Sequence, residues 1–231
     1  MIKKHQNFWI MQLFYVVFVV ICLLASWKIY GKITLHEKWV INLPASMIWN
    51  VFLSLLAFDF AYWAIKLKNR AFVIVLSLLW LIFYPNTFYI LTDNIHFAGW
   101  FETLNLTDSS VVINFNILSI SVIWGSVLGA WSILMMIERF LTKKIWKILI
   151  VIILSFLSSI GIFVGRSLEI RLNSWDLLTH PIYSLTKIFG SLTPENFAFF
   201  ASFTLAQLFL IALFWLVRYN QRKGLQNEEN A

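Results

Sequence analysis

Long runs of apolar residues, separated by short polar connections, dominate the chain. A run of about 18 or more mainly apolar residues is typical of a helix that crosses a bilayer. The pattern predicts six such helices, at Phe8–Trp27, Leu43–Ile65, Ala71–Leu91, Val111–Ile137, Ile145–Val164 and Phe197–Val217. The runs are continuous, whereas strands of a membrane barrel alternate between apolar and polar residues. We therefore expect an all-α integral membrane protein, a bundle of six transmembrane helices.

Composition supports this fold class. The chain has 231 residues, of which 60% are hydrophobic and 13% charged, and its mean hydropathy is +0.78. A soluble domain carries about 25% charged residues, so a soluble fold is excluded. Few residues lie outside the apolar runs, and we expect a single membrane domain over residues 1–220. The polar segment 221–231 is expected to be a disordered cytoplasmic tail.

The distribution of Lys and Arg predicts the orientation of the helices. Net charge is +7 and the pI is about 9.6. In a membrane protein an excess of basic residues marks the cytoplasmic loops, so the charge does not indicate a nucleic-acid partner. With the N-terminus inside, twelve basic residues fall on the cytoplasmic side: Lys3, Lys4, Lys66, Lys68, Arg70, Arg139, Lys143, Lys144, Lys147, Arg218, Arg222 and Lys223. Six fall outside, at Lys28, Lys32, Lys38, Arg166, Arg171 and Lys187. Both termini are therefore predicted to be cytoplasmic.

The longest predicted outer connection, Gly165–Asn196, contains a further helical pattern. Its apolar residues recur at helical spacing, at Leu178, Ile182, Leu185, Phe189 and Leu192. We expect a short amphipathic or re-entrant helix at the outer surface. Pro181 is placed to break or start it, and Gly190 to end it.

The first polar segment lies at the outer end of the third span. Pro85 removes a backbone hydrogen bond and frees a carbonyl, which needs a new partner in lipid. Asn86 and Thr87 are candidate partners. Asp93 and His96 are three residues apart, so they share a face on a helical turn.

The second polar segment follows the fifth span. It carries Arg166 and Arg171, and then Asn173 and Ser174, either of which could cap a short helix. Asp176 and His180 are four residues apart and again share a helical face. The predicted topology puts both polar segments on the same side of the membrane. They are therefore expected to form one outward-facing site.

These two segments carry a resemblance to a known family. Pro85–His96 resembles the signature "LPNAPYILTDLIHL" of a bacterial membrane family catalogued as domain of unknown function 1361, and Arg171–Asp176 is similar to that family's "RxNSWD". The chain departs from the pattern at Thr87-Phe88, where the family often has Ala-Pro. The resemblance implies a multi-pass protein of the bacterial cell membrane, and it implies no activity.

Roles for these residues follow as hypotheses. Acid–base groups alone can run hydrolysis or group transfer, and arginines bind anionic headgroups. The candidate catalytic residues are Asp93, His96 and Asp176. The candidate binding residues, for an anionic lipid or cell-envelope intermediate, are Asn86, Arg166, Arg171 and Asn173. His180 could join the three catalytic candidates as a metal ligand, although no spacing here is diagnostic of a metal site.

Two other functions stay open. A non-catalytic partner or assembly protein would need the outer loops but tolerate changes of Asp and His. A transporter subunit would line a path with Asn50, Asp59 and the break at Pro85-Asn86. Small residues at four-residue spacing, at Ser121, Gly125 and Gly129 and at Gly161 and Gly165, indicate close packing of helices inside the bundle.

Overall fold

The structure is a computed structural model that describes residues 6–38, 41–95, 108–167 and 169–229, and the described residues fold as helices joined by turns and loops. In chain order the helices are α1 (Gln6–Tyr30), α2 (Leu43–Lys66), α3 (Arg70–Phe83), α4 (Pro85–Tyr89), the 3-10 helix η2 (Ile90–Asn94), α6 (Ser109–Phe140), α7 (Lys144–Arg166), α8 (Ser174–Thr179), α9 (Pro181–Gly190), the 3-10 helix η3 (Pro194–Asn196) and α10 (Phe197–Glu229).

Six helical segments of the described chain are long and apolar enough to cross a membrane. Five correspond to the long helices α1, α2, α6, α7 and α10, and the sixth combines α3, α4 and η2. The predicted fold class, an all-helical bundle with six spans, is therefore confirmed. The orientation in the membrane stays a prediction. The end of the bundle where η2 lies and where α2 and α6 begin is called here the predicted outer end.

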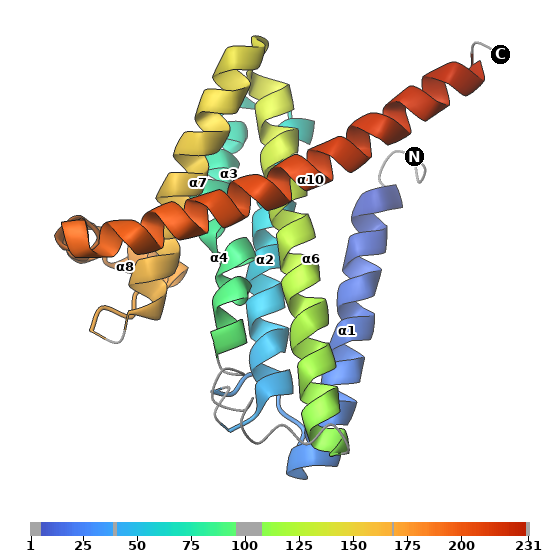
Figure 1. Ribbon diagram of the computed structural model, residues 1–231, viewed down its shortest axis with the longest axis vertical. Coiled ribbons are helices and arrows are strands. Elements are labelled where there is room, and N and C mark those ends of the chain that lie inside the picture. Colours follow the sequence, from blue (N-terminus) through green and yellow to red (C-terminus); the bar gives the residue numbers. More distant parts are fainter. Residues whose placement is uncertain (1–5, 39–40, 96–107, 168, 230–231) are drawn as a thin grey trace.

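Helices α2 and α6 form the centre of the bundle. They pack extensively against each other, and 56% and 61% of their most apolar stretches are buried, against 22% for both α1 and α10. In Figure 1, α10 crosses obliquely over the bundle, and the start of α1 and the end of α10 lie toward the same end. The site described below is built on the α2 side of this centre.

Polar caps define several helix starts. The Asn42 side chain accepts a hydrogen bond from Ala45 N at 3.1 Å at the start of α2. Asp108 does the same for Ser110 N at 2.8 Å at the start of α6. Such caps satisfy amide groups that have no partner within the helix.

The third span is broken where the sequence places Pro85. We expected one helix over Ala71–Leu91, but α3 ends at Phe83, and α4 and η2 continue the span to Asn94. Asn86 and Thr87 do bond carbonyls at the break, but not that of Leu81, which Pro85 leaves without its usual donor: Asn86 Nδ2 donates to Phe83 O at 2.9 Å and Thr87 Oγ1 to Tyr84 O at 2.8 Å. The segment α4–η2 is called here the broken segment.

Glycines on α6 and α7 let those helices approach the broken segment closely. A Cβ at Gly125 would lie 2.7 Å from the backbone oxygen of Thr87, and one at Gly161 would lie 2.9 Å from Pro85 Cγ. A Cβ at Gly129 would meet Thr87 Oγ1 and the Phe88 ring. The small-residue pattern therefore serves packing inside the bundle, as expected.

The connection after α7 contains two short helices, α8 and α9. Helix α9 begins at Pro181 and ends at Gly190, as the pattern predicts. Helix α10 then continues to Glu229, through most of the segment 221–231 that we expected to be a disordered tail. The limit of the membrane domain at residue 220 stays a prediction.

Candidate functional site

Asp93 lies on η2, at the end of the broken segment, and is only 2% exposed. Its Oδ1 accepts a hydrogen bond from Arg166 Nη1 at 3.1 Å, and its Oδ2 accepts one from Asn50 Nδ2 at 2.8 Å. A charge that is removed from water needs a counter-charge and hydrogen bonds. Arg166 at the end of α7 and Asn50 on α2 supply both.

The Arg166 side chain holds the end of the third span against α7. Its Nη2 donates to Thr92 O at 2.9 Å, and its Nη1 lies 3.2 Å from the accepting Tyr89 hydroxyl. The guanidinium lies 5.5 Å from the centre of the Tyr89 ring, a cation–π contact. The charge of Arg166 is thus balanced by Asp93. Its guanidinium N–H groups donate hydrogen bonds to groups of the protein.

A second link joins the two polar segments through Asn86. Asn86 Nδ2 donates to Ser174 Oγ at 2.8 Å, and Ser174 Oγ donates to Ile82 O at 3.1 Å. Ser174 therefore helps to repair the break at Pro85 from the other segment. Ser54 on α2 donates to Asn86 O at 3.1 Å. The two segments meet around the break, as the sequence predicts.

Asp176 has a structural contact in the second segment. Asn173 Oδ1 accepts from Trp175 N at 2.8 Å and from Asp176 N at 3.1 Å, while Asp176 Oδ2 accepts from Asn173 N at 2.8 Å. This reciprocal arrangement is a capping box at the start of α8. Among the contacts of the described residues, none joins Asp176 to Asp93, so these two candidates do not form a pair.

Among the contacts of the described residues, none joins Arg171 or His180 to Asp93. Arg171 is exposed and has a φ of 47°, in the left-handed region that non-glycine residues seldom adopt. His180 is exposed, and its Nδ1 lies 2.9 Å from Thr179 Oγ1. His96 lies outside the described residues. Among the residues that the structure describes, no three His, Cys, Asp or Glu side chains converge as metal ligands.

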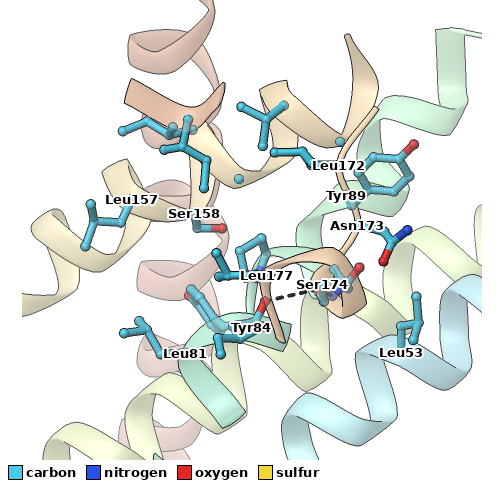
Figure 2. Close-up of a pocket in the computed structure, with 18 of the residues that line it drawn as sticks. Leu53, Leu81, Tyr84, Tyr89, Leu157, Ser158, Leu172, Asn173, Ser174 and Leu177 are labelled. Carbon is cyan, nitrogen blue, oxygen red and sulfur yellow. Dashed lines mark hydrogen bonds between the residues drawn. The ribbon is translucent and has the colours of Figure 1, made fainter. Parts of the chain in front are cut away.

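A cavity of about 470 Å³ lies between the broken segment and α7, bordered also by α2, α3, α8 and α9. Figure 2 shows Tyr89, Asn173 and Ser174 on one side of this cavity and Leu81 and Leu157 on the other. Asn50, Asn86 and Gly165 also line it, so the cavity borders directly on neighbours of the Asp93–Arg166 pair. Its lining mixes the two kinds of side chain, since Leu53 and Leu172 lie on the side of Asn173 and Ser158 lies on the side of Leu157 (Figure 2).

Several residues of this site could not be identified as site residues from the sequence. Asn50 stood out only as a polar residue within the second span, and its pairing with Asp93 depends on tertiary packing. Tyr89 lies within the first polar segment but was not singled out. Ser158 and Ser184 line the cavity from α7 and α9, and serines at such positions are also common in ordinary helix packing.

The intramembrane carboxylate Asp59 belongs to a different place. Its Oδ1 accepts from Gln12 Nε2 of α1 at 2.7 Å. Asp59 follows Asn50 by nine residues on α2, which at about 100° per residue puts the two on opposite faces of that helix. A common path lined by Asn50 and Asp59 therefore has no support in this packing.

The fold and site define a multi-pass helical membrane protein whose broken third span and fifth span enclose a buried ion pair and a cavity. The chain belongs to the family described as "Protein of unknown function (DUF1361)", whose model matches residues 49–210. That match covers most of the chain and confirms the family resemblance of the two polar segments. No curated protein and no solved structure matches the chain.

Proposed function

We propose that this protein binds an amphiphile, an anionic lipid or a lipid-linked intermediate of the cell envelope, in the cavity between the broken segment and α7. The observation that carries the proposal is the mixed lining of the cavity, which is mainly apolar and includes several polar groups. Leu81, Leu157 and Leu185 line it and are 39%, 48% and 45% exposed. Leu81 and Leu157 lie on candidate membrane spans, where exposed leucines face acyl chains, so this rim favours entry from the bilayer.

The polar residues of the lining suit a polar part of the ligand. Asn86, Asn173 and Ser174 line the cavity, as do Asn50 and Tyr89, which are hydrogen-bonded to the Asp93–Arg166 pair. Binding sites for small molecules commonly combine a mostly apolar wall with a few fixed polar groups. Exposed Arg171, which adjoins the cavity-lining residue Leu172, supplies a positive charge near these residues for an anionic head.

The carboxylates of Asp93 and Asp176 are already hydrogen-bonded within the protein, which favours ligand binding over acid–base catalysis. Both oxygens of Asp93 accept hydrogen bonds from protein groups, and Asp176 is part of a helix cap. A general base has to reach a proton on its substrate. We therefore propose that Asp93 positions the end of the third span, and that the amides and Arg171 contact the ligand.

The test uses the full chain, purified in a mild detergent and titrated with phosphatidylglycerol, with bound lipid counted by native mass spectrometry. Leu157→Trp puts a larger side chain at the rim of the cavity and is expected to weaken binding tenfold or more. The matched control is Leu149→Trp on the same helix, because Leu149 is also exposed but does not line the cavity. Equal binding by both variants and the unchanged protein would contradict the proposal.

A further inference from the structure

The carboxyl group of Asp59 lies inside the second span, one helical turn deeper than two exposed tryptophans. Its Oδ1 accepts a hydrogen bond from Gln12 Nε2 of α1 at 2.7 Å. One turn nearer to the start of α1 and the end of α2, the rings of Trp9 and Trp63 lie edge-on to Phe8, with ring centres 5.3 and 5.7 Å from it. Exposed tryptophans collect where a membrane meets water. The Gln12–Asp59 contact therefore lies on the hydrocarbon side of that boundary.

The same contact can be reached from the side of the bundle. Asp59 and Gln12 are both half-buried, and Leu13 next to Gln12 is exposed. Both helices are candidate membrane spans, so exposed surface at this depth faces acyl chains. A molecule dissolved in the lipid can therefore approach Asp59 between α1 and α2, whereas an ion in water has to leave its hydration shell to do so.

Asp59 has no counter-charge within the described part of the chain, where no Lys, Arg or His forms an ion pair with it. Lys66, two turns later on α2, places its ammonium group 5.5 Å from the centre of the Tyr62 ring. On α1 the hydroxyl of Tyr15 donates to Ile48 O at 3.2 Å. The charged residues of α1, α3, η2 and α6 lie near helix ends, at Lys28, Arg70, Asp93, Glu138 and Arg139.

These surroundings favour the neutral acid over the ionised carboxylate. A carboxylate that leaves water without a counter-charge is costly, and such a group takes up a proton instead. The protonated acid keeps an oxygen that accepts hydrogen bonds, so the contact with Gln12 Nε2 fits the neutral form. Asp93 differs, because the guanidinium of Arg166 lies 3.1 Å from its Oδ1.

We propose that Asp59 is a proton-binding site, loaded with its proton inside the membrane and reached from the lipid between α1 and α2. This site is separate from the cavity and does not depend on the proposed function, since Asp59 does not line the cavity. A lipid-facing carboxylic acid of this kind reacts with a lipophilic carbodiimide. The acid oxygen bonds to the central carbon of the reagent while the carboxyl proton moves to one of its nitrogens. The acyl group then transfers to a nitrogen, which gives a stable N-acylurea and consumes no other reactant.

The test uses the full chain in phosphatidylcholine vesicles, treated at neutral pH with dicyclohexylcarbodiimide or with a cationic, water-soluble carbodiimide. Peptide mass spectrometry identifies the modified residue. The lipophilic reagent is expected to modify Asp59 and the water-soluble reagent to leave it unmodified. Modification is expected to fall as the pH is raised, because the reaction needs the protonated acid and the protonated fraction falls with rising pH.

Matched variants separate the acid from its surroundings. Asp59→Asn removes the acid and is expected to abolish the modification at this position. Asp59→Glu keeps an acid there, and Gln12→Leu removes only its neighbour, so both are expected to remain reactive. The proposal is overturned if the lipophilic reagent leaves Asp59 unmodified in the unchanged protein. Equal modification by the two reagents, or modification that does not depend on pH, would overturn it as well, because Asp59 would then be in contact with water or would react without its proton.

Discussion

The two carboxylates Asp93, on η2, and Asp59, on α2, have different surroundings. Asp93 is almost fully buried and has a cation, Arg166, and an amide, Asn50, as partners. Asp59 is half-buried, and Gln12 is its one hydrogen-bond partner among the described residues. The first carboxylate joins η2 to α2 and α7, and the second joins only the neighbouring helices α1 and α2.

This difference indicates which of the two carboxylates helps to hold several helices together. Arg166 reaches Tyr89, Thr92 and Asp93 at once, so removing one member of this group affects the end of the third span and the wall of the cavity. The Gln12–Asp59 contact lies at the peripheral helix α1. We expect large effects of substitution at the first place and small effects at the second.

The largest effect is expected at the ion pair. Arg166→Gln leaves the Asp93 carboxylate buried without its counter-charge, which costs about 3–5 kcal/mol of unfolding free energy. The double variant Asp93→Asn/Arg166→Gln removes both charges and should recover at least about half of that loss. The free energy of unfolding in mixed micelles checks this. If the two single losses simply add in the double variant, the pair does not act as a unit.

An intermediate effect is expected where α6 meets the broken segment. Gly125→Ala pushes a methyl group against the Thr87 carbonyl, 2.7 Å away, and should cost about 1–3 kcal/mol of unfolding free energy by overpacking. Gly190→Ala is the control, because a Cβ there meets nothing within 4 Å, and it should be neutral or slightly stabilising. Equal behaviour of the two variants would mean that α6 and the broken segment are not in close contact.

The smallest effect is expected at the peripheral pair. Gln12→Leu removes one interhelical hydrogen bond, worth about 0.6 kcal/mol on average between membrane helices. A double-mutant cycle with Asp59→Asn measures the coupling between the two side chains. A coupling as large as that between Asp93 and Arg166 would remove the distinction drawn between the two carboxylates.

Breaks and caps that depend on neighbouring residues could be predicted from the sequence, whereas pairing between distant segments could not. The break at Pro85 follows from a short-range rule, and the structure confirms it, with Asn86 and Thr87 bonded to nearby carbonyls. The spacing of Asn173 and Asp176 is that of a capping box, yet a carboxylate three residues after a cap is also what a catalytic role would look like.

The partner of Asp93 is 73 residues away along the chain in Arg166 and 43 residues away in Asn50. Such pairs depend on how α2, η2 and α7 pack, which no local pattern encodes. The two polar segments were expected to converge, and the Asn86–Ser174 hydrogen bond links them. The residues that meet, however, are Asp93 with Arg166 and Asn86 with Ser174. Asp93 does not meet Asp176.

The most direct test of the central claim is an experimental structure of the full chain determined in a lipid bilayer. The account predicts elongated density in the cavity between α4 and α7, leaving past Leu157 and ending in a head near Arg171, with the Asp93–Arg166 pair intact beside it. A cavity closed by α9 packing onto α7, or filled with water alone, would contradict the proposal that an amphiphile binds there.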